Sequence, residues 1–198
     1  MGDELESELS ALMRAKQLDR AATRALESYG PELYGFLISY LGNEADAAEV
    51  FSQVGEDLWN GLPSFKLGCS VRTWLYVLAR HAAARFRRSP WNRRTGESHL
   101  EELVELVRTR TQPWLRSDMK DRFRALRDAL DPDDRSLLIL RVDRGLSWEE
   151  VARVTLGIEA PDTAVLERET IRLRKRYQLL KDELRRRAAE LGLLGDRS

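Results

Sequence analysis

The sequence predicts an all-α protein made of two small helical domains joined by a linker. Apolar residues recur three and four positions apart over most of the chain, which is typical of helices with one buried face. A content of 42% hydrophobic and 33% charged residues indicates a globular, helix-rich protein. At 198 residues the chain is long enough for one domain or two small ones. We expect a first domain at residues 1–90, a linker at 91–118 and a second domain at 119–198.

The first domain is predicted to begin with three helices. One spans residues 5–28, and Gly30 and Pro31 separate it from a second helix that starts at Pro31. Five apolar side chains of the second helix have the spacing of one buried stripe. They are Leu33, Phe36, Leu37, Tyr40 and Leu41. A third helix starts near Glu44 and carries carboxylates on the face opposite its apolar residues.

A fourth helix follows a loop that contains Pro63 and Gly68, and it ends before Pro90. Its apolar residues lie at helical spacing, so one face of the helix is predicted to be buried. They are Val71, Trp74, Leu75, Leu78, Ala82 and Phe86. We expect Trp74 to be a core residue, and the same holds for Trp59 and Trp148.

Charge is strongly segregated along the chain, although the formal net charge is zero. Residues 58–96 hold eight Lys and Arg and no Asp or Glu, whereas residues 1–57 hold twelve acidic and four basic residues. The basic stretch is suited to meet phosphate groups, although a solvated amphipathic helix is the alternative. The segregation therefore predicts two partners, one basic and one a nucleic acid.

The second domain is predicted to hold two capped helices and a long final helix. Asp131 and Pro132 form a cap and a first-turn proline, and Gly145 ends the helix that they begin. Ser147 and Glu150 form a capping box before the next helix. In the linker ahead of this domain, the tryptophans at positions 91 and 114 indicate that it docks on something or packs on the domains.

The final helix is predicted to follow Pro161 and Asp162 and to run to about Leu191. Its apolar residues alternate steps of three and four and form one narrow seam. The seam comprises Leu166, Thr170, Leu173, Tyr177, Leu180, Leu184, Ala188 and Leu191. The basic residues on the opposite side are Arg168, Arg172 and Lys175. A capped helix, a glycine turn and a basic helix are typical of a helix-turn-helix, although a two-helix packing unit with a coiled-coil tail is the alternative.

No enzymatic activity, cofactor or metal is expected. The chain has no glycine-rich phosphate loop, no nucleophile motif and no ligand set at metal-binding spacing. Cys69 is the only cysteine, which excludes an internal disulfide and a cysteine-built metal site. His81 and His99 lie too far apart, without further ligands nearby, to indicate a metal. Without a signal peptide or a long apolar run, we expect no membrane insertion and a cytoplasmic location.

Two groups of motifs resemble bacterial extracytoplasmic-function (ECF, group IV) sigma factors of RNA polymerase. The first group comprises DAAEVFSQ at residues 46–53, Trp59, Phe65-Lys66 and VRTWLYVLAR at residues 71–80. The second group comprises LDPDDR at residues 130–135, GLSWEEVA at 145–152 and LGI at 156–158. The resemblance covers nearly the whole chain, in the right order and spacing. It implies a sigma region 2-like domain, a linker and a sigma region 4-like helix-turn-helix domain with a C-terminal helical extension.

The resemblance also implies which residues bind each partner. The acidic third helix would bind the clamp helices of the polymerase largest subunit through Asp46, Glu49 and Gln53. The loop and the fourth helix would hold the melted strand of the minus-ten element. The residues at those positions are Lys66, Arg72, Trp74, Arg80, His81, Arg85, Arg87 and Arg88. The final helix would contact the minus-thirty-five element in the major groove through Arg168, Arg172, Lys175 and Arg176.

The implied function is that of a sigma factor that binds core RNA polymerase and directs promoter recognition and DNA melting for transcription initiation. The implied partners are core RNA polymerase, including its flap, promoter DNA and a protein regulator such as an anti-sigma factor. Two alternatives remain open. One is a free-standing helix-turn-helix regulator, which the balanced net charge disfavours because autonomous duplex binders gain affinity from positive charge. The other is a sigma-like helical adaptor without promoter recognition, which the unusual link at residues 159–164 leaves possible.

Overall fold

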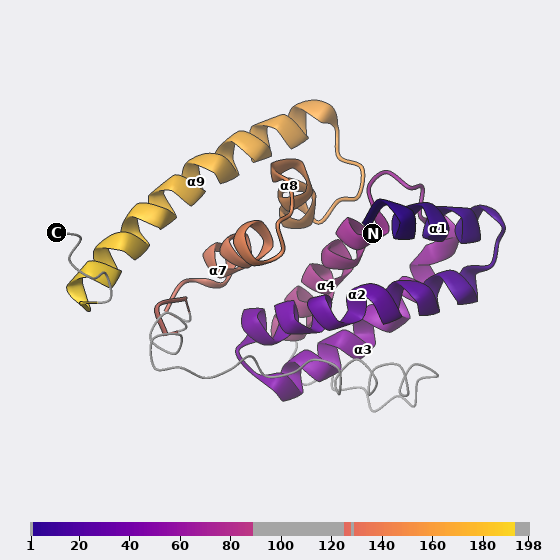
Figure 1. Cartoon of the computed structure of the whole chain (residues 1–198), viewed down its shortest axis with the longest axis horizontal. Coiled ribbons are helices and arrows are strands. Elements are labelled where there is room, and N and C mark those ends of the chain that lie inside the picture. Colours follow the sequence, from indigo (N-terminus) through magenta and orange to yellow (C-terminus); the bar gives the residue numbers. More distant parts are fainter. Residues whose placement is uncertain (1, 89–124, 128, 193–198) are drawn as a thin grey trace. The chain divides into compact units, whose positions relative to one another are not determined.

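The computed structural model describes residues 2–88, 125–127 and 129–192, and the predicted linker lies outside these residues. Every regular element that it describes is helical, which confirms the predicted all-α class (Figure 1). The chain divides into two compact units, Met1–Gln112 with Arg153–Asp162, and Pro113–Ala152 with Thr163–Ser198. The domain boundaries expected at residues 90 and 118 stay a prediction.

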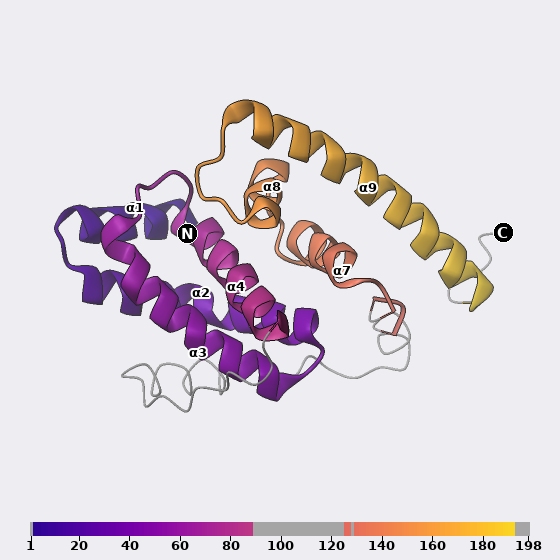
Figure 2. The same cartoon turned by 180° about the vertical axis from the view of Figure 1, so that it is seen from behind.

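In the first unit, the described residues 2–88 form a bundle of four helices. They are α1 (Gly2–Arg14), α2 (Leu18–Leu41), α3 (Glu44–Gly61) and α4 (Val71–Arg88), with a short 3-10 turn η1 (Leu62–Ser64) before the loop that enters α4. Helices α2, α3 and α4 lie side by side and pack on one another, and α1 packs on α2 (Figures 1 and 2). This packing places the loop and both ends of α4 on a rigid base.

Aromatic side chains fill the centre of this bundle. Tyr34 on α2 meets Phe51 on α3 edge to face at 5.5 Å, and Phe36 on α2 meets Tyr76 on α4 at 5.3 Å. All four side chains are at most 1% exposed. Such buried aromatic pairs stabilise the fold by more than the burial of their apolar area alone, so they hold α2, α3 and α4 in one arrangement.

The predicted boundary between the first two helices is wrong. Helix α1 ends at Arg14, where Lys16 takes a left-handed backbone with φ of 56°, and α2 then runs without a break through Pro31. Proline inside a helix costs about 3 kcal/mol because it removes one backbone hydrogen bond and crowds the preceding turn. Burial of apolar residues on both sides of Pro31, among them Leu26 and Leu33, outweighs that cost.

The tryptophan predictions had mixed outcomes. Trp74 is 6% exposed and lies in the core, as predicted. Trp59 is 47% exposed near the end of α3, so its predicted core position is wrong. Trp148 is only half-buried, in edge-to-face contact with Tyr177 at 5.4 Å. Helical spacing places an apolar residue on a face of its helix, but it does not show how far the neighbouring helices cover that face.

The second unit contains α7 (Pro132–Leu138), a π-helical segment η2 (Ile139–Asp143), α8 (Trp148–Leu156), whose first half belongs to this unit, and α9 (Thr163–Glu190). The Asp131 carboxylate accepts from the amides of Asp133 at 2.9 Å and Asp134 at 3.1 Å, which confirms the predicted cap of α7. The predicted capping box is also confirmed, because Ser147 and Glu150 each accept from the other's amide.

The seam of α9 is confirmed over most of its length. Its buried members are Leu166, Thr170, Leu173, Leu180 and Ala188. Tyr177 and Leu184 are partly buried against Leu130, Leu138 and Leu180. Leu191, which follows the end of the helix, is 58% exposed, so the seam ends earlier than predicted. Among the described residues, no helix combines the length and apolar content that a membrane crossing requires.

Candidate nucleic-acid interface

The loop between α3 and α4 has a defined conformation. Phe65 stacks on Trp74, with ring centroids 4.2 Å apart and an interplanar angle of 8°. Leu67 takes a left-handed backbone with φ of 57°, which is uncommon for a residue other than glycine and costs free energy. Lys66, one of the predicted DNA contacts, is exposed between them. The stacked pair therefore anchors a short loop that presents its basic residue to solvent.

The first turn of α4 is capped from two directions. The Ser70 hydroxyl accepts from the amide of Thr73 at 3.0 Å. The Glu6 carboxylate, on α1, accepts from the amides of Val71 at 2.8 Å and Arg72 at 3.0 Å. A carboxylate at a helix N-terminus satisfies amides that have no partner within the helix, and it interacts favourably with the helix dipole.

Arg72, a predicted contact of the minus-ten element, is engaged inside the unit. Its Nε and Nη2 atoms donate to the Glu32 carboxylate on α2 at 2.6 and 2.9 Å. The two side chains are only 27% and 25% exposed, so the pair is partly shielded from water. The guanidinium group also lies 6.0 Å from the ring centroid of Tyr76. Arg72 therefore links α4 to α2 as well as lying beside the loop.

The C-terminal half of α4 carries the other predicted contacts of the minus-ten element. Arg80 is half-buried, whereas His81, Arg85, Arg87 and Arg88 are exposed. The Arg85 guanidinium group pairs with Asp57 on α3. Arg87 lies over the ring of Tyr40 on α2, 4.3 Å from its centroid, and donates to the Tyr40 carbonyl oxygen at 3.1 Å. This end of α4 is thus both basic and fixed to its neighbours.

The predicted polymerase-binding residues lie on α3. Its N-cap is Asn43, whose side-chain oxygen accepts from the amides of Ala45 at 2.8 Å and Asp46 at 3.3 Å. Asp46, Glu49 and Gln53 are half-buried on this helix. The Gln53 amide donates to Glu56 at 3.0 Å and Asp57 at 3.2 Å. Gln53 therefore orients two carboxylates of the acidic face, an interaction that the sequence alone did not reveal.

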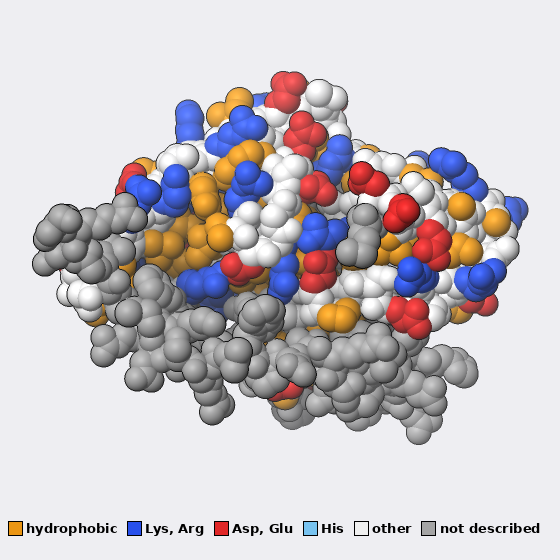
Figure 3. Space-filling model, viewed as in Figure 1, with side chains coloured by type: hydrophobic (Ala, Val, Ile, Leu, Met, Phe, Trp, Pro, Cys, Tyr) orange, Lys and Arg blue, Asp and Glu red, His pale blue; other side chains and the backbone are white. Residues whose placement is uncertain are grey.

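All four predicted contacts of the minus-thirty-five element are exposed on α9. Figure 3 shows basic side chains, in blue, along α9, with acidic ones among them. Arg172 is 62% exposed and donates to Glu169 on the same helix at 2.6 and 2.8 Å. Arg168 donates to the Ala164 carbonyl oxygen at 3.2 Å. The side chains of Arg168 and Arg172 thus lie along the surface of the helix.

Arg176 differs from the other three. It donates through Nε to Asp134 at 2.7 Å, pairs with the same carboxylate through Nη2, and lies 3.8 Å from Asp131. Asp134 is 5% exposed. Burial raises the pKa of Asp131, but the hydrogen bonds from Asp134 and Asp133, followed by the charge of Arg176, outweigh burial and hold the pKa below its usual value. Arg176 therefore joins α9 to the capped start of α7.

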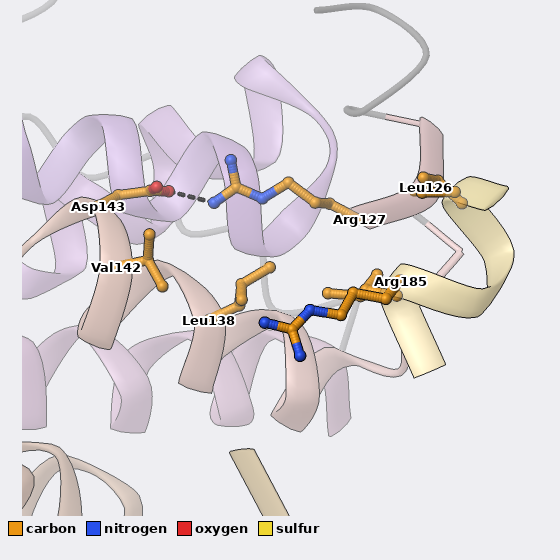
Figure 4. Close-up of a pocket in the computed structure, with 8 residues that line it drawn as sticks. Leu126, Arg127, Leu138, Val142, Asp143 and Arg185 are labelled. Carbon is orange, nitrogen blue, oxygen red and sulfur yellow. Dashed lines mark hydrogen bonds and ion pairs between the residues drawn. The ribbon is translucent and has the colours of Figure 1, made fainter. Parts of the chain in front are cut away.

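An apolar groove of about 340 Å³ also lies in the second unit, between α7, η2 and the C-terminal part of α9. Leu138 and Val142 face Arg185 across it, and Arg127 pairs with Asp143 at its edge (Figure 4). Figure 3 shows hydrophobic side chains, in orange, between α9 and α7. Sequence periodicity did not predict this groove, because the residues that line it come from four separate segments: residues 126–127, α7, η2 and α9.

The comparisons with known proteins agree with the motifs. Residues 25–93 match the family Sigma-70 region 2. The chain is 27% identical over 167 residues to RNA polymerase sigma factor YlaC of Bacillus subtilis, covering 81% of this chain and 96% of that protein. It is 26% identical over 174 residues to ECF RNA polymerase sigma factor SigX of the same organism, covering 80% and 84%.

Among solved structures, the comparison finds the sigma factor RpoE of Bartonella quintana, in complex with the anti-sigma factor NepR. The TM-score is 0.48 at 22% identity, over 79% of this chain and 94% of that chain. Residues 25–93 therefore contain a sigma-70 region 2 domain, and most of the chain is similar to sigma factors, one of them an ECF sigma factor. The domain and these relatives support the function of a sigma factor that directs transcription initiation. This similarity disfavours the free-standing helix-turn-helix regulator, whereas the sigma-like adaptor without promoter recognition stays an alternative.

Proposed function

We propose that this chain divides the work of a sigma factor among three helices. Helix α3 binds core RNA polymerase, the loop and α4 hold the opened promoter strand, and α9 contacts upstream duplex DNA. The observation that carries this division is the charge of the first unit: the acidic face of α3 and the basic stretch of α4 lie on neighbouring helices of one rigid bundle. Such a unit offers carboxylates to a basic protein surface and cations to phosphate groups.

The geometry supports strand binding at the loop rather than in a duplex groove. The aromatic pair Phe65 and Trp74 anchors a short loop that exposes Lys66 next to the basic α4. Single strands are commonly held by basic side chains together with aromatic surfaces. Because Trp74 is buried, we propose that it supports the loop rather than touching a base.

The remaining parts of the proposal concern partners and location. The proposed partners are core RNA polymerase, promoter DNA and a protein regulator. The chain acts through binding and not as an enzyme. Its action on polymerase and DNA places it in the cytoplasm.

Charge reversal on α3 tests the polymerase contact. Asp46→Lys and Glu49→Lys are expected to lower recovery of core RNA polymerase in a pull-down, because lysines would face a basic partner. Glu27→Lys is the matched control, since it makes the same charge change at an exposed position of α2. Undiminished recovery with both α3 variants would remove α3 from the polymerase contact. Equal loss with Glu27→Lys would indicate a general charge effect.

A further inference from the structure

A residue outside the region 2 match holds the start of α4. Residues 25–93 match the family, whereas Glu6 lies on α1. Its carboxylate accepts from the amides of Val71 and Arg72, and also from the Tyr29 hydroxyl at 2.7 Å. Burial, followed by the hydrogen bond to Glu6, raises the pKa of Tyr29, so the phenol stays protonated and donates. Three donors from two other helices thus converge on one carboxylate.

A second carboxylate holds the same turn of α4 from another side. Glu32 on α2 accepts both hydrogen bonds of the Arg72 guanidinium group, at 2.6 and 2.9 Å. The backbone of Arg72 is therefore bound by Glu6 and its side chain by Glu32. Bidentate pairs between arginine and carboxylate fix geometry as well as adding energy. The first turn of α4 is fixed in position and direction by α1 and α2.

This turn continues directly from the loop that carries Lys66 and the left-handed Leu67. A strained loop keeps its conformation only where its ends are firmly held. One end is held by the stack of Phe65 on Trp74. The other end, at Ser70 and Val71, depends on the capping groups of α4, of which Glu6 contributes two accepted hydrogen bonds.

We propose that Glu6 and Glu32 are positioning residues for promoter opening: they touch no DNA, but they set the loop and Arg72 in the conformation that captures the opened strand. This inference rests on the proposed strand-binding role of the loop. Helix α1, which lies outside the family match, would then contribute to DNA opening. Its residue Glu6 acts by accepting hydrogen bonds from the backbone of α4 and from the hydroxyl of Tyr29.

The chain offers a matched control on the same helix. Glu8 is two residues from Glu6 and pairs with Arg24 on α2 at 3.1 Å, with both side chains more than 40% exposed. Glu6→Gln and Glu8→Gln remove the same charge from α1. Both changes replace a carboxylate oxygen with an NH2 group, but only at Glu6 does that oxygen face the backbone amides of α4.

The test uses holoenzyme assembled from core RNA polymerase and the full chain, on a duplex promoter and on the same promoter with the minus-ten region already mismatched. Permanganate reactivity of thymines measures opening, and footprinting at low temperature measures the closed complex. Glu6→Gln is expected to leave the closed complex unchanged and to lower opening on the duplex about tenfold, the scale of one lost hydrogen bond to a charged group. The mismatched promoter restores opening, and Glu8→Gln behaves as wild type.

Two further variants keep the test decisive if Glu6→Gln unfolds at the assay temperature. Tyr29→Phe removes one donor and leaves the amide bonds of Glu6, so it is expected to lower opening by about threefold in the same direction. Glu32→Gln weakens only the hold on Arg72 and is expected to lower opening with the closed complex intact. Thermal unfolding of each variant shows whether the chain is folded in the assay.

Three results would overturn the inference. The first is a level of promoter opening equal to that of the wild type in Glu32→Gln and also in whichever of Glu6→Gln and Tyr29→Phe is folded. Another is an equal defect on duplex and mismatched promoters. A third is an equal defect in Glu8→Gln. If instead the wild-type chain gives no promoter-dependent complex with core polymerase, the proposed function itself fails, which this design distinguishes from a failure of the positioning role.

Discussion

Exchange of Arg176 for methionine should destabilise the second unit, whereas the same exchange at Arg172 should not. Both residues were predicted from the sequence as DNA contacts on α9. Arg176 binds the 5% exposed Asp134 with two donors, and Arg172 binds Glu169 on its own helix with a side chain 62% exposed. Methionine and arginine have similar helix propensities, so the comparison isolates the ion pairs.

The expected magnitudes follow from exposure. Hydrogen bonds to charged groups contribute about 1.5–3 kcal/mol each, and the remaining buried carboxylate would lack its partner. Because the Arg176 side chain is 43% exposed, water offsets part of this loss, and we expect a net cost of about 2 kcal/mol. Exposed pairs within one helix contribute about 0.5 kcal/mol or less, so Arg172→Met should fall within that range.

Hydrogen exchange at the backbone amides of α7 measures the effect locally in the full chain. A loss of 2 kcal/mol corresponds to about thirtyfold faster exchange in Arg176→Met. Adding Asp134→Asn should recover part of the protection, since it removes the uncompensated charge. The reasoning is refuted if Arg176→Met and Arg172→Met exchange at the same rate. It is also refuted if the double variant is no better protected than Arg176→Met alone.

Two further predictions concern the helix ends and the proline of α2. The pKa of Asp131 is lowered in the folded chain, so the ionised carboxylate stabilises the fold above about pH 3.9, and this stabilisation is lost as the pH falls through the folded pKa. Asp131→Asn keeps a capping oxygen but does not titrate, so the free energy of unfolding of this variant should fall less in acid than that of the wild type. An Asn variant with an unchanged acid profile would contradict this. Pro31→Ala should raise the free energy of unfolding by about 1–2 kcal/mol, because it restores one helical hydrogen bond at the cost of a more flexible unfolded chain. A lower stability in urea unfolding would show that the proline is required in α2.

Local signals in the sequence predicted local structure well. The cap at Asp131 and the box of Ser147 and Glu150 depend on residues two or three positions apart, and both form as predicted. The seam of α9 likewise follows from helical spacing. By contrast, Pro31 indicated a helix boundary that tertiary packing overrides, since burial along both halves of α2 exceeds the local cost.

The candidate site could be predicted only in part. The basic and acidic segments were visible from composition, but the partners of their side chains were not. Arg72 meets Glu32 across 40 positions, and its backbone meets Glu6 across 66. Arg176 meets Asp134 across 42. No periodicity encodes such pairs, because only the packing of separate helices brings them together. The predicted DNA contacts therefore include arginines that are already paired with carboxylates inside the fold.

Transcription in vitro with purified bacterial core RNA polymerase tests the central claim most directly. A library of promoter fragments is transcribed with core enzyme alone and with core enzyme plus the chain. In a separate assay, the chain alone is tested for binding to the duplex fragments. Discrete transcripts that start at common sites only when the chain is present, together with weak and unselective binding by the chain alone, are the expected result. Unchanged start sites in the presence of the chain, or tight sequence-specific duplex binding without polymerase, would contradict it.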